Sequence, residues 1–315
     1  MYVKDLSSAL TASSACDLDK ADFVAPAKDM FFDMHANLNV PKTLFGFAEP
    51  MPLNDWAHNQ VCEKLSVPSA YAHRCPPDLR ADNFNHWLKK SDKNWMVRSY
   101  QGNVRAALSS EYVPVSSTEV IEMMIETLGD SAHMLVGSHV DSDNLYAKSM
   151  TMVNEPGTYG MGVCVSNGEV GNRMLEVSPF VLRTSCWNSI VIKHDMSWAH
   201  RHIHATKAWL RGTFKEMFGK AMRVAPDVLE EIVKAELDEL PNFADVVEKV
   251  CKEHGFLPLK DLILIGSEAA QTRMGLVNGL SFAAQQTDNL DTVIGLEALA
   301  GKMLMINYKF QMVDA

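Results

Sequence analysis

The chain has 315 residues, of which 47% are apolar and 22% are charged, and its formal net charge is −10. This composition is typical of a folded protein and excludes a largely disordered chain. The acidic balance argues against a protein that coats nucleic acid through its overall charge. No stretch approaches eighteen consecutive apolar residues, and the first residues lack a signal-peptide pattern. We therefore expect no membrane partner and a cytoplasmic location.

Charge is unevenly distributed along the chain. Residues 73–105 carry seven basic and three acidic side chains, and residues 183–223 carry eight and two, whereas residues 224–255 carry three and nine. Such segregation predicts a local anion-binding surface on an otherwise acidic protein. The six cysteines lie far apart and form no C-x-x-C pair, so we expect reduced, mostly buried thiols and neither a metal site nor a cofactor.

The N-terminal part of the chain shows little periodicity. Residues 1–52 predict an irregular arm, followed by one domain over residues 53–315. Asn54 is a suitable N-cap for a helix that ends before Pro68, and a second short helix is expected around residues 77–90.

The middle of the chain is rich in strand patterns. Residues 94–108 predict a hairpin that turns around Gly102, and "EYVPVS" predicts a third short strand. A helix with Ser117 as its cap follows, which gives a strand-strand-strand-helix order. Five further strands are expected within residues 133–195, from "HMLVGSH" to "WNSIVIKHD".

From residue 198 onward the pattern is helical. The candidate helices cover residues 199–222, 227–240, 243–254, 272–286 and 291–305. Short helices, then strands, then helices predict an α+β fold, in which helices pack on a mostly antiparallel sheet in the middle of the chain. The C-terminal region over residues 198–315 completes this domain.

The stretch "HDMSWAHRHIHATKAWLRGTF", residues 194–214, concentrates histidine, tryptophan and basic side chains. On a helix, five of these cationic or partly cationic groups would share one stripe: His200, His204, Lys207, Arg211 and Lys215. A stripe of this kind can neutralise phosphates and release their counterions.

Further residues are expected to extend this surface. Trp198 and Trp209 can stack unpaired bases, and Arg201 adds a charge beside the stripe. Arg98 and Arg105 on the hairpin and Arg183 near a strand end are expected to contact phosphates as well.

Two alternatives remain open for the same stretch. The cations can form a solvated helix face that pairs with the acidic helices that follow. His200 and His204, four residues apart, can also bind a metal together, but the glutamate of an H-E-x-x-H motif is absent and Arg201 and Lys207 repel a divalent cation.

Other candidate chemistry is sparse. His139, Asp141 and Asp143 in "SHVDSDNLY" either form an ordinary turn or bind a hard cation. Cys186 is either a structural thiol or a nucleophile paired in space with a histidine. No phosphate-binding loop with P-loop or dinucleotide spacing is present in the sequence.

Several short motifs occur in the order found in a known family. They are R-x-x-C-x-N, then R-H, then a threonine-led helix with G-L-x-N, here Arg183, Cys186, Asn188, Arg201, His202, Thr272, Gly275, Leu276 and Asn278. Over about residues 53–305 the chain resembles the phage- and plasmid-borne domain of unknown function 932 family. It departs from the family pattern at Gly279, where alanine is usual, and in the strand "VCVSNGEVGNR".

The resemblance implies a protein of a mobile element in a bacterial host cell. Such elements commonly encode proteins of DNA replication, recombination or defence, and the strand-strand-strand-helix order invites a fold-level comparison with ring-forming annealing proteins. We therefore expect a homo-oligomer that binds single-stranded DNA without catalysis. The alternatives are a self-assembling structural protein that does not bind DNA, and a metal-dependent nuclease or nucleotide-processing enzyme.

Overall fold

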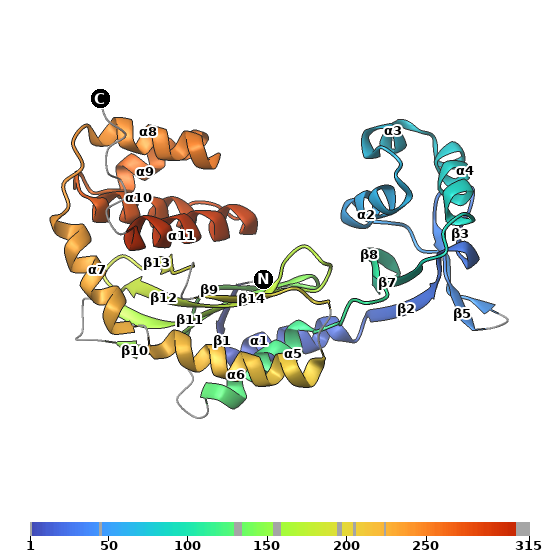
Figure 1. Cartoon of the computed structure of the whole chain (residues 1–315), viewed down its shortest axis with the longest axis horizontal. Helices are drawn as coiled ribbons and strands as arrows, with labels where there is room; N and C mark the ends of the chain where they lie inside the picture. Colours follow the sequence, from blue (N-terminus) through green and yellow to red (C-terminus); the bar gives the residue numbers. More distant parts are fainter. Residues whose placement is uncertain are drawn as a thin grey trace.

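The computed structural model describes residues 2–43, 46–128, 134–153, 159–193, 197–203, 206–223 and 225–306. The fold is of the mixed α+β class, as the order of predicted elements indicates. Figure 1 shows a central sheet with helices beneath it and one arm of the molecule rising at each side.

The central sheet combines the N-terminal strand with strands from the middle of the chain. In the described ranges it has seven strands, all antiparallel to their neighbours: β1 (Tyr2–Asp5), β9 (Met134–Val140), β10 (Asn144–Val153), β11 (Tyr159–Gly168), β12 (Leu175–Arg183), β13 (Asn188–Val191) and β14 (Trp198–His200). Their order is β1-β9-β10-β11-β12-β13, and β14 also pairs with β12. The N-terminal strand β1 thus forms one edge, where Tyr2 pairs with His139.

Three helices cover one face of this sheet. Val163 and Val165 of β11 and Val177 of β12 alternate along their strands and share a buried cluster with Ile121 and Phe214. The covering helices are α1 (Leu6–Asp17), α5 (Ser117–Leu128) and α6 (Lys207–Arg223), which Figure 1 shows below the sheet. Because α6 turns its apolar side to the sheet, its basic side faces solvent.

Residues 20–109 form one arm, which we call the N-terminal lobe. The lobe is inserted between α1 and α5, two helices that pack against each other. Its three-stranded sheet runs in the order β2-β7-β8, with β2 (Lys20–Pro26), β7 (Asn94–Tyr100) and β8 (Asn103–Ser109). The sheet carries the three helices α2 (Asp55–Leu65), α3 (Ser69–Arg74) and α4 (Pro77–Leu88). Smaller elements complete the lobe: η1 (Ala27–Asp29), β3 (Phe31–Phe32), β4 (Leu38–Asn39), β5 (Pro41–Thr43) and β6 (Gly46–Phe47). A separate core around Trp95 and Phe84 stabilises this arm.

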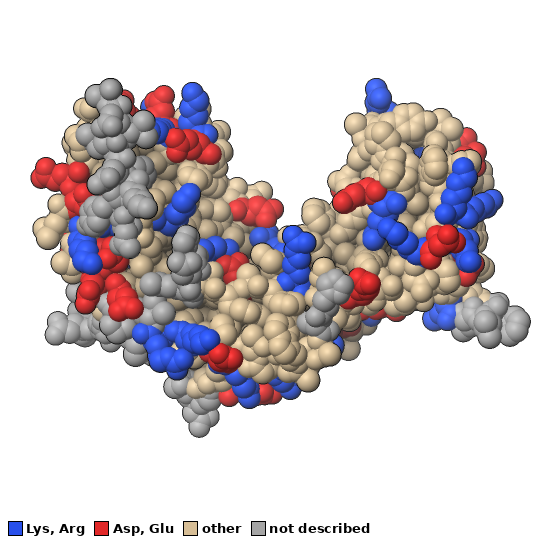
Figure 2. All heavy atoms as spheres, in the orientation of Figure 1, with Lys and Arg blue, Asp and Glu red and all other residues tan. Residues whose placement is uncertain are grey.

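The opposite arm, the C-terminal helical lobe, consists of α7 (Ala225–Leu237), α8 (Phe243–His254), η3 (Leu257–Leu259), α9 (Lys260–Gly266), α10 (Arg273–Gln285) and α11 (Leu290–Met305). Helix α11 lies directly on β13 at Gly301, where a β carbon would come within 1.9 Å of the Val191 carbonyl oxygen. Figure 2 shows a wide hollow between the two arms. None of the helices within the described ranges combines the length and the apolar character that crossing a membrane requires.

Elements with clear start and stop residues match their predictions. Asn54 caps α2 by accepting a hydrogen bond from the Ala57 N–H at 2.8 Å, and Gly255 ends α8 with a φ of +78°. The hairpin of β7 and β8 and the five strands from β9 to β13 are also confirmed.

The structure differs from the predictions in the first 52 residues and in the segment before α5. Instead of an irregular arm, the N-terminus contributes β1 to the central sheet, β2 to the sheet of the N-terminal lobe, and the helix α1 between them. Helix α1 is rich in Ser, Ala and Thr and has no broad apolar stripe, so its periodicity is weak. The segment "EYVPVS" is not a strand: within it, Tyr112 makes only an isolated bridge to Ile203. The predicted strand-strand-strand-helix order therefore lacks its third strand.

Candidate nucleic-acid interface

The stretch predicted as one long helix divides into a strand and a shorter helix. β14 pairs with the start of β12, with Trp198 opposite Val177 and His200 opposite Leu175. Helix α6 begins only at Lys207. The expected helix over 199–222 was therefore wrong at its N-terminal end, because sheet pairing fixes residues 198–200 in an extended conformation.

The five-residue stripe is accordingly not formed as predicted. Lys207, Arg211 and Lys215 lie on α6 at spacings of four residues and share one side of it. His200 lies on β14 instead, and His204 lies outside the described residues.

Pairing of β14 with β12 creates an aromatic cluster of Trp198, His200 and Trp209. The ring centroids of His200 and Trp209 are 4.7 Å apart in an edge-on arrangement, and those of Trp198 and His200 are 6.0 Å apart. The Trp198 and Trp209 centroids are 6.5 Å apart. Trp209 is 47% exposed, so part of its indole surface is open to a ligand. The two tryptophans expected to stack bases therefore lie together, and His200 contacts both.

The cations of α6 are paired with acidic residues of α5. Lys207 Nζ lies 2.7 Å from Glu119 Oε1, and Glu126 lies 3.6 Å from Arg211 and 3.4 Å from Lys215. All three basic side chains are about half exposed. The acidic partners thus come from the preceding helix α5 and not from the acidic helices that follow. Exposed pairs of this kind contribute little to stability, because water and salt screen them.

Arg98 and Arg105 do not contact the surface as expected. Arg98 is 4% and Arg105 is 2% exposed, and both reach Glu169, which follows β11 and is fully buried. Arg105 Nη2 lies 2.9 Å from Glu169 Oε2, and Arg98 Nη1 donates to the Glu169 carbonyl oxygen at 2.6 Å. The sites predicted to hold phosphates are therefore inside the protein.

Lys20 and a backbone amide complete this group, which we call the Glu169 cluster. Lys20 Nζ lies 2.9 Å from Glu169 Oε1, and the Ser117 N–H donates to the same oxygen at 2.7 Å. Burial alone would raise the pKa of the Glu169 carboxyl, but Lys20 and Arg105 outweigh it and hold the pKa below its usual value. The carboxylate is ionised and links the N-terminal lobe to the central sheet and to α5.

His202, the histidine of the R-H motif, is also buried. Its ring stacks on Tyr112 with centroids 5.2 Å apart, and 3% of the residue is exposed. Burial lowers the pKa of His202 to about 4, so the imidazole is neutral at pH 7. His202 thus packs the sheet against the segment that precedes α5.

The remaining motif residues meet at the contact between β13 and α10. Asn188 Nδ2 donates to the Asn278 carbonyl oxygen at 3.4 Å, and Gln285 Nε2 donates to the Cys186 carbonyl oxygen at 3.4 Å and to Asn188 Oδ1 at 2.7 Å. Thr272 caps α10 by accepting a hydrogen bond from the Gly275 N–H at 3.1 Å. Two motifs about ninety residues apart in the sequence therefore stabilise one helix-to-sheet contact.

Arg183 belongs to this contact and not to the aromatic cluster. Its guanidinium lies 3.6 Å from Glu268. Arg183 ends β12, whereas β14 pairs with the opposite end of that strand at Leu175, eight residues and roughly 26 Å away. Arg183 therefore does not extend the surface around Trp198 and Trp209.

The residues considered for a hard cation are engaged elsewhere. His139 Nε2 lies 2.7 Å from Asp141 Oδ2, while Asp143 Oδ1 lies 3.1 Å from Arg105 Nη1. Asp141 Oδ1 accepts the backbone N–H groups of Asp143 and Asn144, as in an ordinary turn. In the part of the chain that the structure describes, no three His, Cys, Asp or Glu side chains are placed to hold a metal ion together.

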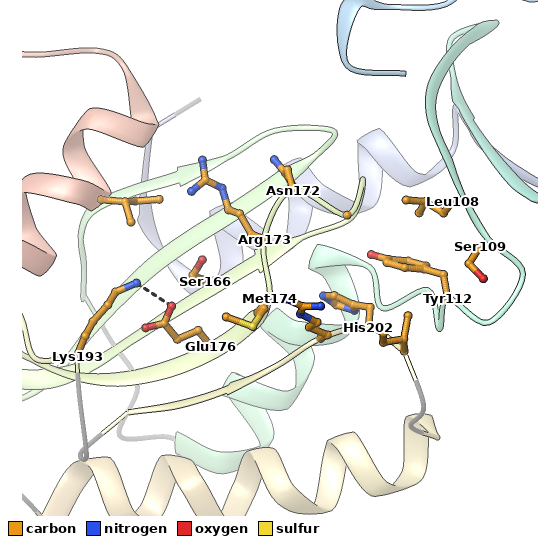
Figure 3. A pocket seen from close by; sticks show the side chains of 14 residues that line it. Leu108, Ser109, Tyr112, Ser166, Asn172, Arg173, Met174, Glu176, Lys193 and His202 are labelled. Carbon is orange, nitrogen blue, oxygen red and sulfur yellow. Dashed lines mark hydrogen bonds and ion pairs between the residues drawn. The ribbon is translucent and has the colours of Figure 1, made fainter. Parts of the chain in front are cut away.

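A pocket of about 540 Å³ is lined in part by Arg201 and His202, which follow β14 (Figure 3). No family model, curated protein or solved structure that was compared with the chain matches it. Function therefore has to be inferred from the residues themselves.

Proposed function

We propose that the protein binds single-stranded DNA at the aromatic cluster and at the basic side of α6. Bases would stack on Trp209 and Trp198, and Lys207 and Arg211 would bind the phosphates. The family resemblance implies a phage or plasmid as the setting, where such a protein would act on DNA strands during recombination as an oligomer.

The observation that carries the proposal is the grouping of three aromatic rings beside the first turns of a basic helix. Stacking on an aromatic side chain contributes about 1–3 kcal/mol per base and tolerates any base. A half-exposed indole next to cations spaced along a helix provides both parts of such a site. This combination suits a flexible single strand, whose bases are free to leave their own stack.

The ion pairs on α6 do not prevent phosphate binding. Arg211 and Lys215 share the single carboxylate of Glu126, which leaves an excess of positive charge there. The three cations are about half exposed, so exchanging a screened carboxylate for a phosphate costs little. Counterion release from the DNA then favours binding at low salt.

The test is fluorescence anisotropy with a labelled oligothymidylate at low salt. Trp209→Ala should weaken binding roughly 5- to 100-fold, because one stacking contact is lost. Trp87→Ala is the matched control, since Trp87 lies on α4 in the N-terminal lobe and is 45% exposed, against 47% for Trp209. Equal affinity of the two variants would contradict the proposal. Oligomers that form identically with and without DNA would instead support a structural role.

A further inference from the structure

The pocket lined by Arg201 and His202 lies where three parts of the molecule meet. Leu108 and Tyr112 come from the end of the N-terminal lobe and the segment after it. Met174 and Glu176 come from the start of β12 and the residue before it, and Ile294 comes from α11. Figure 3 shows Arg173, Lys193 and Glu176 toward α11, with Tyr112 and Leu108 on the opposite side. Pockets of about 300–1,000 Å³ at the junction of lobes are the usual sites for small ligands, and this one measures about 540 Å³.

The wall of the pocket carries more positive than negative charge. Three cations line it, Arg173, Lys193 and Arg201, against the single carboxylate of Glu176. Lys193 Nζ lies 2.7 Å from Glu176 Oε2. Arg201 is exposed, and no carboxylate in the described ranges pairs with it. The neutral ring of His202 adds no charge, so the lining favours an anionic ligand.

The third cation is held loosely. Arg173 pairs with Asp291, whose side chain is 81% exposed, and its Nε donates to Asn144 Oδ1 at 3.0 Å. A solvent-exposed carboxylate is easily replaced by a ligand anion, because water screens the pair. Arg173 and Arg201 both line the pocket and can therefore offer guanidinium groups to a bound phosphate, which such groups bind in a bidentate manner.

Apolar side chains form a second part of the lining, beside the polar groups of Ser109, Ser166 and Asn172. Leu108, Tyr112, Met174, Ile203 and Ile294 contribute hydrocarbon or ring surface. Met174 is 42% exposed, so its flexible thioether is available to pack on a ligand. A ligand that fills this space therefore needs an apolar or planar part as well as an anionic group.

We propose that this pocket binds a nucleotide, with the phosphate at Arg201 and Arg173 and the nucleoside against Met174 and Ile294. The nucleotide is either free in solution or the phosphorylated end of a DNA strand. The proposal does not depend on strand binding at the aromatic cluster, since neither Trp198 nor Trp209 lines the pocket.

Isothermal titration calorimetry of the full chain with deoxyadenosine monophosphate tests the proposal. Met174→Trp should abolish binding by filling the pocket, whereas Met34→Trp should not, because Met34 lies in the N-terminal lobe outside the pocket and is 70% exposed. Arg201→Ala should weaken binding roughly tenfold or more through loss of charge-assisted hydrogen bonds. Lys220→Ala is its control, an exposed cation near the end of α6 outside the pocket.

Three results would overturn the proposal. They are absence of heat with the wild-type chain, equal affinity of Met174→Trp and Met34→Trp, and binding of inorganic phosphate as tight as that of the nucleotide.

A displacement experiment identifies the source of the nucleotide. If a 5′-phosphorylated oligonucleotide displaces the monophosphate and its unphosphorylated form does not, the pocket holds strand ends; if neither displaces it, the ligand is free nucleotide. Both results support a nucleotide pocket, and Trp209→Ala tests the strand interface separately.

Discussion

The two cationic stretches of the chain, residues 73–105 and 183–223, use similar side chains in opposite ways. In the first, Arg98 and Arg105 are almost completely buried and meet Glu169, which has no exposed surface. In the second, basic residues of α6 remain about half exposed and meet Glu126, whose side chain is 43% exposed. Local charge density along a sequence therefore does not distinguish an internal ion cluster from a binding surface. The burial of the partner carboxylate, Glu169 or Glu126, distinguishes the two.

The comparison predicts its largest effect at the two carboxylates. Glu169→Gln leaves Lys20, Arg98 and Arg105 without their buried counter-charge, so we expect the free energy of unfolding to fall by roughly 3–5 kcal/mol. Glu126→Gln, which also removes a carboxylate shared by two cations, should cost less than about 1 kcal/mol. Chemical denaturation of both variants measures the difference. Similar losses of unfolding free energy in Glu169→Gln and Glu126→Gln would contradict the distinction between a buried ion cluster and an exposed basic surface.

A second effect concerns acid stability. The pKa of His202 falls from 6.5 to about 4 on folding, so the unfolded chain takes up this proton first as pH decreases. The contribution of neutral His202 is complete above pH 6.5 and is lost as pH falls toward 4, which amounts to about 3 kcal/mol. His202→Phe should therefore flatten the fall in unfolding free energy between these pH values. His35→Phe, at an exposed position, serves as the control, and an unchanged slope in His202→Phe would contradict the prediction.

The smallest effect on stability is expected on the exposed side of α6, where substitutions should change the affinity for single-stranded DNA most. Lys207→Glu combined with Arg211→Glu should lower the affinity for single-stranded DNA by at least about tenfold at low salt, through repulsion of phosphates. Both residues lie on the exposed side of α6, so the unfolding free energy should change by only about 1 kcal/mol. Anisotropy and thermal unfolding of the same preparation check both statements. Unaltered affinity would place the DNA site elsewhere.

Much of the fold can be read from residues that start or stop elements. Asn54 and Gly255 define the ends of α2 and α8, because an N-cap side chain and a left-handed glycine act locally. The position of β14 could not be found in this way. Its three residues continue the helical pattern of α6, and only pairing with β12, whose register is set by distant strands, makes them extended.

The candidate site was predictable only in part, because some of its contacts are local in sequence and others join distant residues. Trp198, Trp209 and Lys207 are close in sequence, which indicates that they share one region, but the arrangement of the two indoles depends on the pairing of β14 with β12. The burial of Arg98 and Arg105 depends on Glu169, which is 64 positions after Arg105. One signal was available: both arginines lie inside apolar strand runs, "WMVRSY" and "NVRAAL", where a charged side chain has to meet a buried partner.

The insertion of the N-terminal lobe between α1 and α5 has a consequence for how the chain matures on the ribosome. β1 emerges first, yet its partner β9 follows more than 120 residues later, so the central sheet cannot close until the lobe has been synthesised. Such distant pairing slows folding and leaves the edge of β1 open to mispairing in the meantime. The lobe, with its own core, is able to fold during this interval and present Lys20, Arg98 and Arg105 in place before Glu169 arrives.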